Sequence, residues 1–302
     1  MDQQLLLIAL AGFAASLVDG TLGMGFGPTS STILLSSGLS PVAASTTVNL
    51  AKVATGIAGA ISHWRFRNID HRLVLTLAIP GCVGALLGVT VLANVNGATL
   101  RPILAALLLL VGLRILLRFS RPLPSGSHPG PDGNALDHDH DPDRLPDYRS
   151  VGVGAAAAAG GVTNGLIGAW GPIVTPYLLH KGLPPRFSIG SVNTAEVAVA
   201  AVSAGTLLGA LGSGGISVSV VIAMLLGGIV AAPISAYVVR KVPARPLGVA
   251  VGGLLLLTNS RDLADWAGLG TIRWLLYGVA VVLVALAALY PRFMRADEPV
   301  PA

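Results

Sequence analysis

"GPTSSTILLSSGLSPVAASTTVNLAK", residues 27–52, occurs twice in this chain in related form. The second copy, "GPIVTPYLLHKGLPPRFSIGSVNTAE", occupies residues 171–196, and the offset of 144 residues continues without a gap to residues 54 and 198. Twelve of the 28 aligned positions are identical, and the Gly-Pro, Gly-Leu-x-Pro and Val-Asn-x-Ala matches keep their register. Shared apolar bias does not place glycines, prolines and asparagines in register. The sequence therefore predicts two homologous halves.

The composition is that of an integral membrane protein. Hydrophobic residues make up 53% of the chain and charged residues only 11%, whereas soluble domains carry about 25% charged residues. The net charge of +5 is therefore interpreted through membrane topology, and no nucleic-acid partner is expected. The single cysteine, Cys82, cannot form an intrachain disulfide and leaves the redox compartment open. The apolar N-terminus has no positively charged leader and is expected to belong to the mature protein.

The order of the apolar segments predicts an all-α protein with two repeats and one extra C-terminal helix. Most segments approach the roughly 20 residues that a helix needs to span a membrane. The predicted organisation is repeat 1 at 1–118 (hairpin 3–37, helices 41–62, 73–95 and 99–118), a polar cytoplasmic linker at 119–149, repeat 2 at 150–260 (hairpin 150–181, helices 185–208, 216–239 and 246–260) and a final transmembrane helix at 271–290.

Both hairpin segments are interrupted by glycine-rich stretches. "DGTLGMGFGP" occupies residues 19–28, and "TNGLIGAWGP" occupies residues 163–172. Glycine clusters followed by proline end one helix and begin another. Because the resulting arms are short for spanning, each segment is predicted to be a re-entrant hairpin whose irregular tip is covered by protein.

The distribution of cationic residues predicts that the two repeats are inverted. If each hairpin returns to its own side, 14 Lys and Arg residues face one side and three face the other, with Lys52 and Arg114 inside the membrane. Cytoplasmic loops collect Lys and Arg. This places the N-terminus outside and the C-terminus in the cytoplasm, in the inner or plasma membrane. Inverted repeats with broken helices hold their substrate near the membrane midplane, between the repeats.

Lys52 is an ammonium group in the middle of an apolar helix. An isolated lysine at the bilayer centre costs about 2.5–3.5 kcal/mol on insertion scales. The equivalent position of the second half is Glu196, so the two residues could form an ion pair that locks the repeats together. Alternatively, Lys52 and the N-termini of two half-helices, which begin near Pro28 and Pro172, could form an anion site.

The candidate site follows from these two alternatives. Candidate substrate-binding residues are Lys52, Asn49, Asn193, Thr29, Ser30, Gly27, Gly171 and Ser45. Asn49 and Asn193 could equally brace the hairpin tips, because asparagine in membrane helices often bonds to a neighbouring helix. Glu196 and Asp19 are candidate charge partners or carriers of a coupling proton, and Asp19 could instead cap a turn.

No enzymatic chemistry is expected. The apolar core holds no metal-ligand set, no nucleophile paired with a base and no nucleotide loop, so neither a cofactor nor a metal is predicted. The linker contains "HDHDPD" at residues 138–143, which could bind a metal weakly or be a solvated acidic loop. The expected partners are a small anion, the lipid bilayer and a coupling proton, and a homo-oligomer is left open.

Over nearly its whole length the chain resembles the sulfite exporter TauE/SafE family, also called the toluene sulfonate uptake permease family, and the second half matches best. The resemblance rests on the glycine-rich breaks, the "VN-x-A" helix and Gly171, Pro176, Leu178, Leu179, Gly182 and Pro184. The first half departs from the pattern, because Thr32 stands where the family has proline. The resemblance implies a secondary transporter of sulfite, sulfonate or a related organosulfur anion. A passive anion channel and a permease for a non-sulfur organic anion are the alternatives.

Overall fold

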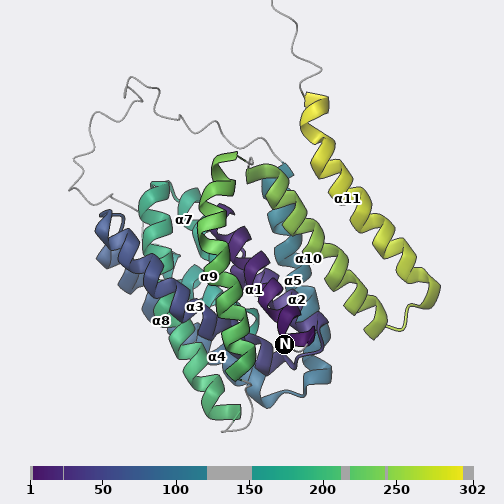
Figure 1. Ribbon diagram of the computed structural model, residues 1–302, viewed down its shortest axis with the longest axis horizontal. Helices are drawn as coiled ribbons and strands as arrows, with labels where there is room; N and C mark the ends of the chain where they lie inside the picture. The colour runs from purple at the N-terminus through teal and green to yellow at the C-terminus, as the bar shows by residue number, and fades with distance from the viewer. Residues whose placement is uncertain (1–2, 23, 121–151, 212–217, 242–243, 295–302) are drawn as a thin grey trace, which may run out of the picture.

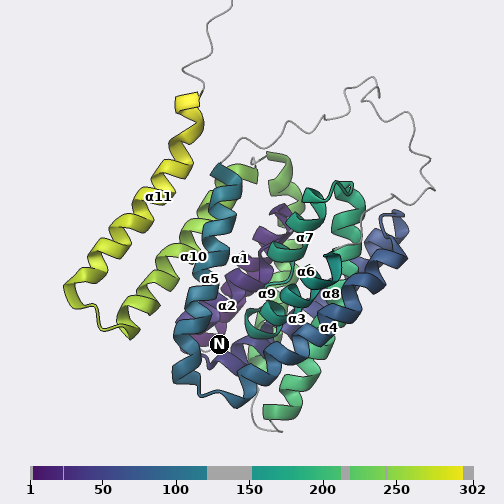
Figure 2. The ribbon, with the colours of Figure 1, turned by 180° about the vertical axis from the view of Figure 1, so that it is seen from behind.

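The computed structural model describes residues 3–22, 24–120, 152–211, 218–241 and 244–294, and within these ranges every regular element is a helix (Figures 1 and 2). The predicted all-α class is therefore confirmed. Most of the predicted linker lies outside the described residues. The helices are α1 (Gln3–Leu22), α2 (Phe26–Ser36), α3 (Pro41–Arg65), α4 (His71–Asn94), α5 (Gly97–Ser120), α6 (Val153–Ile167), α7 (Gly171–His180), α8 (Pro185–Leu211), α9 (Val218–Lys241), α10 (Ala244–Trp266), the 3₁₀ turn η1 (Gly270–Ile272) and α11 (Arg273–Met294).

Several helices have the length and surface of membrane spans. α4, α5 and residues 186–210 of α8 are long and apolar enough to cross a bilayer, and shorter apolar stretches occur in α1, α6, α9 and α11. Large apolar side chains such as Leu75 and Ile79 of α4 are more than half exposed on the outside of the bundle. A surface of this kind is stable in lipid, where exposed apolar side chains carry no penalty.

Glycines let three helix pairs approach closely. α4 packs on α6, α1 on α9, and α5 on α10. A Cβ atom on Gly84 of α4 would lie 2.0 Å from the carbonyl oxygen of Ala158 in α6, and one on Gly12 of α1 would lie 2.1 Å from that of Met224 in α9. Small residues at helix crossings allow backbone contact in lipid, where van der Waals packing drives association.

The repeated Gly-Leu pair ends a half-helix in the same way in both halves. Gly38 follows α2 and Gly182 follows α7, both with positive φ, 93° and 87°. In each copy the amide of the next residue, Leu39 or Leu183, donates to the carbonyl five residues earlier at 3.2 Å. This is a Schellman turn, which favours glycine because a Cβ is strained in the left-handed conformation.

The two glycine-rich breaks lie against each other inside the bundle. α1 ends at Leu22 and α2 begins at Phe26, whereas α6 ends at Ile167 and α7 begins at Gly171. A Cβ on Gly27 would lie 1.8 Å from the carbonyl oxygen of Gly168, so the two breaks are in backbone contact. Irregular backbone at this depth is thereby covered by protein.

The close helix contacts predict which glycines tolerate a methyl group. Gly84→Ala should lower the midpoint of thermal unfolding in detergent, because overpacking a tight contact typically costs about 1–3 kcal/mol. Gly59→Ala on α3 is the matched control, since a Cβ there meets no atom within 4 Å. Equal midpoints for the two variants would contradict the packing account.

Candidate functional site

The broken end of α6 is held by side chains from the first half of the chain. The last carbonyl groups of a helix have no intrahelical partner, and this helix end is buried inside the bundle. Four side chains of the first half donate hydrogen bonds to backbone carbonyl oxygens at this end. Asn49 Nδ2 donates to Asn164 at 3.4 Å, and Ser45 Oγ donates to Gly165 at 2.8 Å. Ser31 Oγ donates to Ile167 at 2.8 Å, and Lys52 Nζ donates to Gly168 at 2.7 Å. The interface between the halves is thus built on a helix end.

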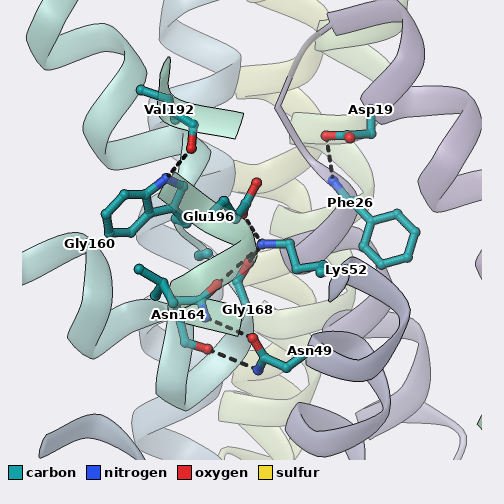
Figure 3. Close-up of polar contacts among 12 residues, drawn as sticks. Asp19, Phe26, Asn49, Lys52, Gly160, Asn164, Gly168, Val192 and Glu196 are labelled. Carbon is teal, nitrogen blue, oxygen red and sulfur yellow. Dashed lines mark hydrogen bonds and ion pairs between the residues drawn. The ribbon is translucent and has the colours of Figure 1, made fainter. Parts of the chain in front are cut away.

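Lys52 has a partner for each of its three ammonium protons. It is only 7% exposed. Its Nζ donates to the Gly168 carbonyl oxygen, to Asn164 Oδ1 at 3.2 Å and to Glu196 Oε1, with which it forms an ion pair (Figure 3). A lysine offers three donors, and a cation is favoured at the negative end of a helix dipole. These contacts offset the cost of burying the charge.

Asn164 links the two halves and was not predicted from the sequence. It is fully buried, and its Nδ2 donates to Asn49 Oδ1 at 2.7 Å and to Ser203 Oγ at 3.2 Å while its Oδ1 accepts from Lys52. Its counterpart in the first half is Gly20, so the repeat alignment carried no sign of it. The sequence signal that could have indicated Asn164 is its position, four residues before Gly168, the glycine at which α6 ends.

A small cavity lies where the two breaks meet. It measures about 10 Å³, room for about one water molecule. Its lining includes six of the ten sequence-predicted residues, namely Lys52, Glu196, Asp19, Asn193, Gly27 and Gly171. Both α2 and α7 begin at this cavity, so the positive ends of two helix dipoles are directed at it.

The other predicted residues lie nearby but do not line the cavity. Asn49 and Ser45 bond to the end of α6 instead. The hydroxyl groups of Thr29 and Ser30 on α2 are buried and have no hydrogen-bond partner in the part of the chain that the structure describes. Asn193, on the cavity wall, also contacts Nε2 of His63 through its amide nitrogen at 3.3 Å.

Asp19 closes the first break. Its Oδ1 accepts from the Phe26 amide at 3.3 Å, across the gap between α1 and α2. The counterpart residue, Thr163, closes the second break, because its Oγ1 donates to the Ala169 carbonyl oxygen at 2.7 Å. The turn-capping alternative for Asp19 therefore matches a contact that the structure contains. Asp19 also faces the cavity opposite the Lys52–Glu196 pair (Figure 3).

The chemistry available at this cavity is that of ion binding. One ammonium group, two carboxyl groups, an amide and two helix N-termini converge on it. Among the described residues no group of three His, Cys, Asp or Glu side chains could hold a metal ion. Such a set can bind a small charged solute through hydrogen bonds and charge.

The network predicts that Asn164 is important for stability. Asn164→Leu would leave Lys52 and Asn49 each without one buried partner, a loss of about 2–4 kcal/mol. The midpoint of thermal unfolding in detergent should fall well below that of Asn94→Leu. Asn94 is the matched control, because it lies on α4 and is exposed, with its amide bonded only to its own helix. A small, equal effect of both changes would show that the network contributes little.

Comparison with known proteins gives consistent results. The family model described as "Sulfite exporter TauE/SafE" matches residues 8–261. The chain is 37% identical over 277 residues to the "Probable membrane transporter protein YtnM" of Bacillus subtilis (strain 168), and the match covers 91% of this chain and 88% of that protein. No solved structure matches the chain. Both matches extend across the two halves and the cavity between them.

Proposed function

The chain belongs to the sulfite exporter TauE/SafE family of membrane transporters, and from this premise we propose that it is a secondary transporter of a small sulfur-containing anion such as sulfite or a sulfonate. The observation that carries the proposal is the central cavity, where Lys52 and the starts of α2 and α7 converge. Sulfur oxyanions are recognised by charge-assisted hydrogen bonds, which a lysine and helix N-termini supply.

Packing between counterpart helices supports an inverted-repeat architecture. Lys52 and Glu196 occupy equivalent positions, 144 residues apart, and contact each other directly. α3 packs on its counterpart α8, and α5 packs on its counterpart α10. Equivalent residues meet in this way on a twofold axis. Together with the cation distribution, this supports two inverted repeats, each with a re-entrant hairpin and three spanning helices, in the cell membrane.

The charges around the cavity favour coupling to protons. With Lys52, Glu196 and Asp19 all ionised, the cavity wall carries a net charge of −1. An anion would be repelled by this wall, since like charges at close range interact unfavourably in a low-dielectric site. Protonation of one carboxyl group removes the repulsion. We therefore assign the coupling-proton role to Asp19 or Glu196.

Anion binding requires the Lys52 contacts to rearrange. All three Lys52 donors are used within the protein, and the cavity has room for about one water molecule. A sulfite ion must therefore separate Lys52 from Glu196 and move the two breaks apart. Rocking of one repeat against the other, as in transporters with inverted repeats, supplies such a movement. Asn193 and the first amides of α2 and α7 would then complete the site.

The proposed orientation is tested by cysteine labelling in cells. In a Cys82→Ser background, Asn96→Cys should react with a membrane-impermeant thiol reagent from outside, and Arg65→Cys should react only after the membrane is permeabilised. Both positions are exposed, one in the α4–α5 connection and one at the end of α3. Reaction of both cysteines from the same side would contradict the inverted repeats.

The role of Lys52 is tested by a variant that keeps hydrogen bonding but removes charge. In Lys52→Gln with Glu196→Gln, the amide of residue 52 can still donate to the end of α6 and to residue 196. If Lys52 provides the charge for an anion, this protein should fold, with a thermal midpoint within a few degrees of wild type, yet take up radiolabelled sulfite at least about tenfold more slowly in proteoliposomes.

Glu196→Gln alone is the control for this experiment, since it retains the ammonium group. It should preserve sulfite exchange and lose the dependence on a proton gradient if Glu196 carries the proton. Wild-type uptake by the double variant would assign Lys52 to capping α6 and refute the anion site.

A further inference from the structure

A second and much larger cavity opens at one end of the bundle. It measures about 410 Å³ and lies between the end of α2, the start of α5 and the end of α10, the end at which the N-terminus is marked in Figure 1. Its polar lining consists of Ser36, Arg101, Asn259, Asp262 and Asp265. In the proposed topology this end faces the outside.

Arg101 lines this cavity together with Asp262, which is near enough to interact with its charge. Within the described residues its exposed guanidinium makes neither a hydrogen bond nor an ion pair. The counterpart in the second half, Arg245, donates instead to the carbonyl oxygens of Phe119, Ser120 and Ala287 and so fastens α10 to α5 and α11. The arginine at this position therefore fastens helices together only in the second half, through Arg245.

The other charges at the mouth leave a positive balance. Asp265 is shared by Arg261 and Arg273, each at 3.7 Å. The charged residues of the lining are Arg101, Asp262 and Asp265. Arg261 and Arg273, which contact Asp265 from outside the lining, bring the whole cluster of three arginines and two aspartates to a net charge of +1. These are the three cations that the inverted topology assigns to the outside. Positive potential at a cavity mouth raises the local concentration of anions.

Helix α2 connects this cavity to the central one. Its first residues line the central cavity, and its last residues line the outer one. The helix has 11 residues and therefore spans about 16 Å. Between its ends lie the two buried hydroxyls without partners, on Thr29 and Ser30, and Thr32, which accepts from Asn259 of the outer cavity at 3.1 Å. An unpaired buried hydroxyl costs about 1–3 kcal/mol, and a route for a polar solute gives these groups a use.

We propose that the outer cavity is the external vestibule of the transport route. In it Arg101 holds the small oxyanion at the mouth, and helix α2, which carries the hydroxyl groups of Thr29 and Ser30, leads to Lys52. The inference rests on the proposed function, because it assigns the entry site for the same substrate. The same residue type thus has different contacts in the two halves: Arg101 lines an open cavity, whereas Arg245 is bonded to backbone carbonyls.

The role of the Arg101 charge in capturing the anion is tested by measuring how sulfite transport in proteoliposomes depends on sulfite concentration. Arg101→Gln should raise the KM for sulfite roughly three- to tenfold and leave the maximal rate near that of wild type, because it removes a capture charge. Arg261→Gln is the matched control: it also removes one positive charge from this end, but from a residue that does not line the cavity, so its KM should rise less than that of Arg101→Gln. Equal KM values for the two variants would overturn the proposal.

The location is tested independently of any arginine. In a Cys82→Ser background, Ala98→Cys places a thiol in the vestibule, and Thr99→Cys places one on the next residue, exposed but outside the lining. An external, membrane-impermeant sulfonated maleimide forms a thioether that sulfite does not cleave. Applied first and washed away before sulfite is added, it should slow sulfite transport by the first variant several-fold. Transport by the second should not change.

The outcomes separate the two proposals. If the wild-type protein transports no sulfur oxyanion, the proposed function fails. If it transports sulfite and modified Ala98→Cys transports as fast as modified Thr99→Cys, only the vestibule proposal is refuted. This outcome can be read even if Arg101→Gln does not fold, because the cysteine variants keep Arg101.

Discussion

The buried end of α6 is the constraint on which the rest of the structure depends. A helix that stops inside the bundle leaves its last carbonyl groups without a partner in its own backbone. This chain satisfies them with side chains of the other half, from Ser31 on α2 to Lys52 on α3. Breaking the helix thus fixes how the halves dock, and it places an ammonium group at the point where both breaks meet. The same requirement explains why so polar a cluster, with Asn49 and Asn164, is stable at this depth.

The two halves share a backbone plan but differ in the side chains that matter most. Lys52 faces Glu196 across the interface, and Arg101 lines an open cavity while Arg245 is bonded to backbone carbonyls. Asp19 and Thr163 close equivalent breaks, one as an acceptor and the other as a donor. A strictly symmetric pair of halves would place like charges on the axis, which is unfavourable in a low-dielectric interior. The differences at the Lys52/Glu196 and Asp19/Thr163 positions give the central cavity its charge, whereas the equivalent arginines differ only in their contacts.

Much of the fold could be predicted from the sequence because its cause is local. The Gly-Leu pair after α2 and α7 required a left-handed turn, and the glycine-proline stretches required helix ends. Polar residues near the end of α10 misled the prediction of its length: α10 continues to Trp266, past the predicted end at residue 260, with an Arg261–Asp265 contact one turn apart. That contact becomes visible only once the helix is formed.

The site could be predicted only in part, because its remaining contacts depend on how the halves dock. The lysine and glutamate at equivalent positions were informative, since a charge in an apolar helix needs a partner. Asn164 was missed because its counterpart is glycine. Ser45 and Asn49 share a helix face with Lys52, but the sequence does not show that this face meets the end of α6 and not the cavity.

Selenite, the selenium analogue of sulfite, offers the most direct measurement of the central claim. Anomalous diffraction from crystals grown with selenite would locate the selenium atom without reference to any transport assay. The account predicts a peak between Gly27 and Gly171, with an oxyanion oxygen about 3 Å from Lys52 Nζ and the Lys52–Glu196 contact broken. Selenium bound elsewhere, with Lys52 still paired to Glu196 and to the end of α6, would contradict it.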